Sequence, residues 1–334
     1  MNFRVKTFIT ILTAVLCTDA AGQGDWKMET EKALAQISTE QLDREISFLS
    51  DTLCKGRATG TRGNIEAAFW IKRKFERAGL TCLTEGYGSH FVTPTGAVAH
   101  NVIGMMPGAF SVPRDRYIII GAHFDHLGEL NGQTYPGADA NASGTVALTS
   151  LADIFGAMKR MGKVYDSSII FVAFDAKEMN MAGSQALWKL IDYGMIKDPL
   201  SGKSIGKEQI RLMVNIDQIG STLSPIHRDR EDYMLMLGNH SLPKEKRSCI
   251  EECNMMYGTD LDLCLSYYGS RTFTDVFYRL SDQKVFVDNR IPAVLFTSGI
   301  TMNTNKTRDT AASLNMEVLL KRITLIYHWT EQLL

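Results

Sequence analysis

Three apolar segments of this 334-residue chain each end in polar side chains, and this feature constrains the fold most. The segments are residues 118–120, 169–174 and 214–216, and the polar residues that follow them are His123 with Asp125, Lys177 with Glu178, and Asp217. Open α/β sheets bind their ligands beyond the carboxyl ends of their strands. We therefore expect these side chains to meet at one edge of a sheet.

Apolar strands alternate with amphipathic helices along the chain. We predict strands at residues 101–105, 117–122, 168–174, 212–216, 233–237 and 293–297. We predict helices at 143–161, 183–193, 243–255 and 316–333, and a polar loop at 221–232. This order predicts the α/β class, with a mostly parallel mixed sheet flanked by helices on both faces.

Two further helices are predicted nearer the N-terminus. Ser38 and Gln41 form a capping-box pattern, and Leu42, Ile46 and Leu49 follow at helical spacing. The second helix is expected to start with Asn64 as its cap and to end at Gly79. Its predicted apolar face consists of Ile65, Ala68, Phe69, Ile71 and Phe75.

The first 22 residues have the pattern of a secretory signal. Arg4 and Lys6 form a basic start, residues 8–16 are apolar, and residues 20–22 are small. The apolar run is about half of the roughly 20 residues that a spanning helix needs. Lipidation at Cys17 is an alternative, although Leu16 is larger than such a site favours. We predict a signal peptide at 1–22, one domain at 23–334 without a transmembrane segment, and export to the periplasm or cell exterior.

The composition is that of an ordinary globular protein, with 45% hydrophobic and 22% charged residues. A net charge of −1 gives no electrostatic reason to expect a nucleic-acid partner. Cleavage after residue 22 would leave an odd number of cysteines, namely Cys54, Cys82, Cys249, Cys253 and Cys264. We expect buried thiols or one local disulfide, because no histidine or cysteine pair nearby completes a tetrahedral metal site.

Several short motifs follow one another in a specific order. They are GRATGTRG at 56–63, NVIG at 101–104, GAHFDHLG at 121–128, GADANASG at 137–144, FVAF at 171–174, Gly183-Ser184 and Asp309-Thr310. In this order and spacing, nearly all of the mature chain resembles the zinc-dependent exopeptidase family of di-zinc leucyl-type aminopeptidases. The resemblance implies an aminopeptidase-like fold and, in an intact member, two zinc ions about 3.5–4 Å apart.

By this resemblance, four residues match positions of the family's metal site. His123 and Asp217 stand at ligands of one zinc, and Glu178 stands at a ligand of the other. Asp125 stands at the carboxylate that orients the histidine ligand, as metal-bound imidazoles usually require.

Three positions depart from the family pattern. Ala140 replaces the bridging aspartate, Lys177 the general-base glutamate, and Asn305 the final histidine. Gln283 also stands where the family often has a histidine. An ammonium cannot take a proton from water, and its charge opposes a dication. The ligands left for each zinc are fewer than the three or four that zinc sites use.

We therefore expect no cofactor and an impaired or inactive homologue that binds a peptide, glycan or protein, with Lys177 paired to Glu178 or Asp217. One alternative is an active metallo-aminopeptidase that uses zinc in a rearranged or single-metal site, and a bridge supplied by Asp139 would require a shift of the backbone. Another is metal-free chemistry by a Lys177 of lowered pKa. Glutaminyl cyclase activity has less support, since only Glu178 of its three ligands is present.

Overall fold

The structure is a computed structural model that describes residues 26–109, 116–222 and 231–334. The predicted signal at 1–22, including Cys17, lies outside the described residues, as does most of the loop predicted at 221–232.

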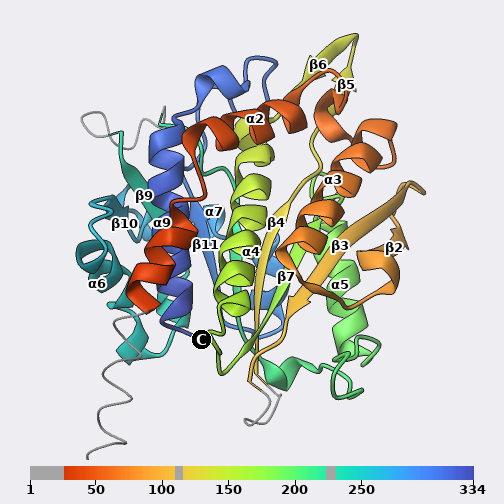
Figure 1. Ribbon diagram of the computed structural model, residues 1–334. Coiled ribbons are helices and arrows are strands. Elements are labelled where there is room, and N and C mark those ends of the chain that lie inside the picture. Colours follow the sequence, from red (N-terminus) through yellow and green to blue (C-terminus); the bar gives the residue numbers. More distant parts are fainter. Residues whose placement is uncertain (1–25, 110–115, 223–230) are drawn as a thin grey trace, which may run out of the picture.

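A nine-stranded mixed sheet forms the centre of the fold (Figure 1). Its strands are β1 (Thr81–Cys82), β2 (Gly88–Val92), β3 (Val98–Met106), β4 (Tyr117–His123), β7 (Ser168–Phe174), β8 (Ile210–Ile216), β9 (Tyr233–Leu237), β10 (Asp262–Cys264) and β11 (Ala293–Thr297). Their order is β1-β3-β7-β4-β8-β11-β9-β10, and β2 also pairs with β3. The central strands β7, β4, β8 and β11 are parallel, whereas β3 runs antiparallel to β7, and β9 runs antiparallel to β11 and parallel to β10.

Helices cover both faces of this sheet, which confirms the predicted fold class. One face packs against α2 (Thr39–Ser50), α3 (Arg62–Ala78), α4 (Gly144–Arg160), α6 (Cys249–Met256) and α9 (Met316–Glu331). The other packs against α5 (Ala182–Asp192) and α8 (Gln283–Asp288). In β4, Ile118 and Ile120 belong to the first core, and Tyr117 and Ile119 to the second. Successive side chains of a strand point to opposite faces, so a strand buried on both sides is apolar throughout.

Helix α3 differs from its prediction in its start and in its buried face. The Thr61 side chain accepts a hydrogen bond from the Asn64 main-chain nitrogen, so Thr61 is the cap and Asn64 lies inside the first turn. Ile65 and Phe69 are each 55% exposed. The buried face instead includes Lys74, whose ammonium pairs with Glu45 at 2.9 Å and with Asp153 at 2.7 Å. A buried lysine breaks the apolar pattern from which the face was predicted.

The helix predicted at 243–255 is two separate elements. A short 3-10 turn at Lys244–Lys246 precedes α6, and the Arg247 guanidinium between them donates to the carbonyl oxygens of His240 and Leu242. These side-chain bonds hold the segment in a turn. All five cysteines of the described residues are free thiols, so the predicted alternative of a local disulfide is not seen.

A hairpin and a short helix lie outside the elements described so far. Strands β5 (Gly128–Leu130) and β6 (Gln133–Tyr135) form a separate hairpin, and α7 (Arg271–Phe277) precedes α8. Within the ranges that the structure describes, no helix has the length and apolar character needed to cross a bilayer.

Helices α3 and α4 approach closely at Gly156, and this contact gives a first prediction. A β-carbon at residue 156 would lie 2.1 Å from the main-chain oxygen of Ala78. Because that atom belongs to a helix backbone, we expect Gly156→Ala to lower the free energy of unfolding by about 1–3 kcal/mol. Gly206→Ala is the matched control, since its nearest neighbour would be 3.9 Å away. Denaturant unfolding that gives equal stabilities for the two variants would contradict this contact.

Candidate functional site

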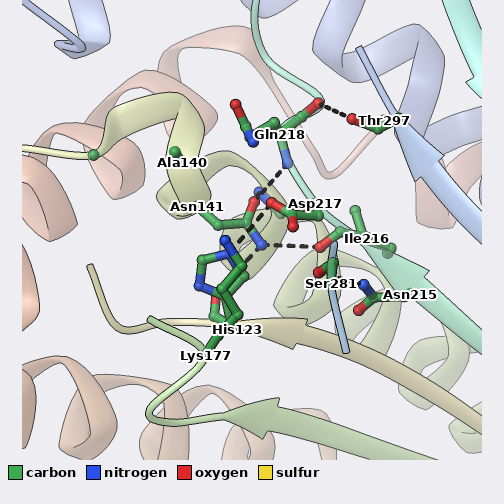
Figure 2. A network of polar contacts seen from close by, with 12 residues as sticks. His123, Ala140, Asn141, Lys177, Asn215, Ile216, Asp217, Gln218, Ser281 and Thr297 are labelled. Atoms are coloured by element: carbon green, nitrogen blue, oxygen red, sulfur yellow. Dashed lines mark hydrogen bonds and ion pairs between the residues drawn. The ribbon is translucent and has the colours of Figure 1, made fainter. Parts of the chain in front are cut away.

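His123 and Asp217 lie side by side because their strands are parallel neighbours. His123 is the last residue of β4, Asp217 directly follows β8, and Gly121 of β4 lies opposite Asn215 of β8. His123 Nε2 is 3.2 Å from Asp217 Oδ1 (Figure 2). Both side chains are buried. The structure thus brings together these two residues that the sequence predicted at one sheet edge.

The side-chain amide of Asn141 joins the ends of these two strands (Figure 2). Its Nδ2 donates to the carbonyl oxygens of Ile216 at 2.9 Å and His123 at 3.3 Å. Its Oδ1 accepts from the main-chain nitrogens of Gly144 at 3.0 Å and Gln218 at 2.9 Å. A β-carbon at residue 144 would lie 2.3 Å from Asn141 Oδ1, so this approach requires glycine. The amide uses its full bonding capacity to set the spacing of the strand ends.

Asp125 positions the turn that follows β7. Its carboxylate accepts from the main-chain nitrogens of Lys177 at 3.0 Å and Glu178 at 3.1 Å. His123 Nδ1 is 3.1 Å from the Asp125 main-chain oxygen and 3.6 Å from Asp125 Oδ1. The Asp125 main chain therefore makes the closer contact with the ring, whereas the resemblance implied that the Asp125 carboxylate would make it.

Lys177 forms the ion pair that its position suggested. Its Nζ lies 2.9 Å from Glu178 Oε1. Burial alone would lower the pKa of Lys177, but the Asp217 and Glu178 carboxylates raise it above its usual value. Lys177 is therefore an ammonium at neutral pH. The alternative of metal-free chemistry required a lowered Lys177 pKa, whereas the pKa of Lys177 is raised.

The charges of the histidine and aspartate stabilise each other. Burial opposes protonation of His123, yet Asp217 and a hydrogen bond with Asp125 raise its pKa to about 10. Burial would also raise the pKa of Asp217, but His123 and Lys177 hold it well below its usual range. At neutral pH the pair is an imidazolium next to a carboxylate.

One cavity gathers all three positions that depart from the family pattern. It has a volume of about 260 Å³, and its lining includes Ala140, Lys177, Asp217 and Asn305. We call it the Asp217 cavity. These residues come from segments far apart in the sequence, so their meeting in one cavity is a property of the fold. Glu178 is not part of the described lining, but it forms an ion pair with Lys177, which is.

Asp139 does not turn toward the Asp217 cavity. Its Oδ1 accepts from the main-chain nitrogens of Gly220 at 2.8 Å and Ser221 at 3.2 Å, and from Ser143 Oγ at 3.1 Å. Among the described residues that line the cavity, Ala140 is present and Asp139 is not. The alternative in which Asp139 supplies a bridging carboxylate therefore has no support from the geometry.

Asp309 holds the main chain at Asp139 and Ala140 in place. Its carboxylate accepts from the main-chain nitrogens of Asp139 at 2.8 Å and Ala140 at 3.1 Å. Asp309 does not cap the last helix, α9, because its cap is Asn315, whose side chain accepts from Val318 N at 3.1 Å. Asp309 therefore holds Ala140 at the cavity wall.

Gln283 occupies a buried position behind the cavity. Its Oε1 accepts from Asn215 Nδ2 at 2.7 Å, and the same Nδ2 donates to Ser281 Oγ at 2.9 Å. The side chain is fully buried. Gln283 thus joins β8 to the start of α8, and this contact is structural.

The apolar wall of the Asp217 cavity was not predicted from the sequence. This wall contains Leu237, Tyr267, Phe277, Leu280, Leu295 and Ile300. The rings of Tyr267 and Phe277 stack with centroids 3.9 Å apart. Gly299 has φ +82°, and a β-carbon there would lie 3.0 Å from the Tyr267 hydroxyl oxygen. Several of these residues come from short turns, which are too short to carry a periodic sequence signal.

Few side chains near the Asp217 cavity are of the types that bind zinc. Across residues 26–109, 116–222 and 231–334, no group of three or more His, Cys, Asp or Glu side chains is placed to hold a metal ion. His123 and Asp217 are nevertheless residue types that zinc accepts, and their facing atoms are 3.2 Å apart. This donor set fits one zinc ion at most and does not fit a pair.

Comparison with known proteins identifies the family. The model of Peptidase family M28 matches residues 101–330, which is more than half of the chain. The chain therefore belongs to peptidase family M28.

Individual proteins are also similar to this chain. The uncharacterized protein YfbL of Escherichia coli (strain K12) is 25% identical over 218 residues, which are 60% of this chain and 60% of that protein's length. The crystal structure of the LapA aminopeptidase of Legionella pneumophila matches with a TM-score of 0.67 at 19% identity, over 92% of this chain and 75% of the other. BSAP, a zinc aminopeptidase from Bacillus subtilis, matches with a TM-score of 0.63 at 12% identity, over 89% and 95%. At these identities the structural matches show the fold alone.

The comparisons correct one expectation, namely that this chain has no cofactor. A solved structure with the same fold is a zinc aminopeptidase, and the chain itself belongs to a peptidase family. The expectation of no cofactor is therefore wrong, and zinc is the cofactor that a proposal for this site has to include.

Proposed function

We propose that this chain is an M28 homologue that binds a ligand with an apolar end in the Asp217 cavity and hydrolyses peptide bonds poorly or not at all. The observation that carries the proposal is the meeting of Ala140, Lys177 and Asn305 around Asp217 in one cavity. Peptide hydrolysis requires a group that takes a proton from water and groups that stabilise the charge of the transition state.

Lys177 does not meet the first of these requirements, which is a group that accepts a proton from water. Its Nζ is protonated and bonded to Glu178 Oε1 at 2.9 Å, so it has no lone pair to accept a proton. The nearest carboxylates are already paired, Glu178 with Lys177 and Asp217 with His123. A general base typically contributes about 10²–10⁴-fold to the rate.

Zinc is the cofactor of this proposal, and His123 Nε2 and Asp217 are the groups that would hold it. Bound zinc would polarise a carbonyl oxygen or a water molecule. Ala140 and Asn305 contribute neither a carboxylate nor an imidazole at the cavity, and the ammonium of Lys177 repels a dication. We therefore expect one weakly held zinc ion, in competition with the His123–Asp217 ion pair.

Export is a further part of the proposal. It depends on the basic start, apolar run and small residues within 1–22, with residues 23–334 as the mature domain. Intact mass measurement of the protein recovered from its native compartment should give a chain that begins at residue 23.

The proposed function is tested by assaying hydrolysis of leucine p-nitroanilide and leucyl peptides with added zinc. We expect kcat/KM to be at least about 100-fold below that of a zinc aminopeptidase measured beside it, because a general base is lacking. Turnover comparable with that of the control enzyme, abolished by Glu178→Ala, would reject the proposal and establish the metallo-aminopeptidase alternative.

A further inference from the structure

The Asp217 cavity carries one positive and one negative side chain. Among the described residues that line it, the charged ones are Lys177 and Asp217. Both side chains come to the same cavity from separate segments, Lys177 from the turn after β7 and Asp217 from the end of β8. A ligand that complements this part of the cavity would itself carry one carboxylate and one ammonium.

Both side chains have bonding capacity left for such a ligand. An ammonium has three N–H donors, and within the described part of the chain the Lys177 side chain uses one of them, for Glu178 Oε1 at 2.9 Å. A carboxylate has about four lone-pair sites. Asp217 directs Oδ1 toward His123 Nε2 at 3.2 Å, which leaves sites for an ammonium.

The remainder of the cavity suits an apolar side chain of limited size. Tyr267 and Phe277 present stacked rings, and Leu237, Leu295 and Ile300 add aliphatic surface. The volume of about 260 Å³ lies below the roughly 300–1,000 Å³ of pockets that take drug-sized ligands. A single amino acid matches this size better than a longer peptide does.

We propose that the Asp217 cavity binds a free apolar amino acid as its zwitterion, with the ligand carboxylate on Lys177 and the ligand ammonium on Asp217. This inference rests on the proposed function and names the ligand class of the same cavity. A peptide N-terminus would offer an ammonium to Asp217 but only an uncharged amide to Lys177. The lysine therefore shifts recognition from the end of a peptide to a complete amino acid.

Three probe ligands that share one side chain test the ligand carboxylate and the ligand ammonium separately. L-phenylalanine carries both, L-phenylalaninamide lacks the carboxylate, and 3-phenylpropionate lacks the ammonium. We expect calorimetric titration to give a Kd for phenylalanine that is at least about tenfold below those of the other two, since each lost charge removes a charge-assisted hydrogen bond. Titrations with added zinc and with a chelator keep metal binding at Asp217 from being mistaken for ligand binding.

Substitution of Lys177 provides the decisive comparison. Lys177→Gln should weaken phenylalanine binding about tenfold and leave phenylalaninamide binding unchanged, and Lys177→Arg should retain the preference. Lys189→Gln, at an exposed lysine outside this cavity, is the matched control. Equal loss for both ligands, no preference for phenylalanine, or no binding of any probe would overturn the inference. Peptide hydrolysis by the unaltered protein would reject the proposed function alone, because free amino acids report binding independently of hydrolysis.

Discussion

Restoring the three missing side chains together should create a zinc-dependent aminopeptidase. The variant Ala140→Asp/Lys177→Glu/Asn305→His places two carboxylates and an imidazole in the cavity that already contains Asp217. It also removes the ammonium that pairs with Glu178 and frees that carboxylate for a metal. With zinc supplied, we expect kcat/KM on leucine p-nitroanilide to rise by at least about 100-fold, the typical effect of a general base.

Two further variants serve as controls. Ala140→Asp alone should remain inactive, because Lys177 would still be present beside the new carboxylate. Asp217→Asn added to the triple variant should abolish the gained activity, since it removes a retained ligand. Elemental analysis should show two zinc equivalents in the triple variant and at most one in the unaltered protein. Two bound equivalents without activity would show that the three departures do not account for the proposed loss of catalysis.

Removing the Arg57 side chain should lower the free energy of unfolding by about 3–5 kcal/mol, as expected when a buried charged group leaves its partners unpaired. The guanidinium is fully buried and donates to Phe124 O at 2.7 Å, to Leu49 O, and to Pro136 O and Gly137 O at 2.8 Å each. These carbonyls belong to segments that flank the site. Arg57→Ala removes the guanidinium donor from all four oxygens, although Gly137 O still accepts from the Ala142 main-chain nitrogen at 3.1 Å.

Arg62→Ala is the matched control for this prediction, because the Arg62 side chain is 87% exposed. It should change the free energy of unfolding by less than about 0.5 kcal/mol. Denaturant unfolding measures both variants. A loss below about 1 kcal/mol for Arg57→Ala would mean that water or neighbouring groups satisfy the carbonyls.

The strands and their polar ends could be predicted from the sequence because they follow from simple burial. Strands β4, β7 and β8 are mostly apolar and almost entirely buried, and parallel neighbours bring their carboxyl ends together. His123 and Asp217 were located in this way, and they meet at 3.2 Å. The mixed-sheet class was likewise predictable.

Other features depended on contacts that no local pattern encodes. The buried face of α3 contains Lys74, which is inward because Glu45 and Asp153 are within 2.9 Å and 2.7 Å of its ammonium. Asp309 contacts the turn at Asp139 and Ala140, about 170 residues earlier in the chain. Several residues of the apolar cavity wall come from short turns. Long-range pairing and irregular backbone decide such positions, and neither has a sequence period.

The Asn141 amide has a consequence for how related chains are recognised. Asn141 and Gly144 hold β4 and β8 at a fixed spacing, and this requirement exists whether or not any reaction takes place between them. Selection for a folded protein can therefore preserve this part of the signature after catalysis has been lost. A database search that depends on it will collect active and inactive chains alike, and only the residues at the cavity surface can separate them.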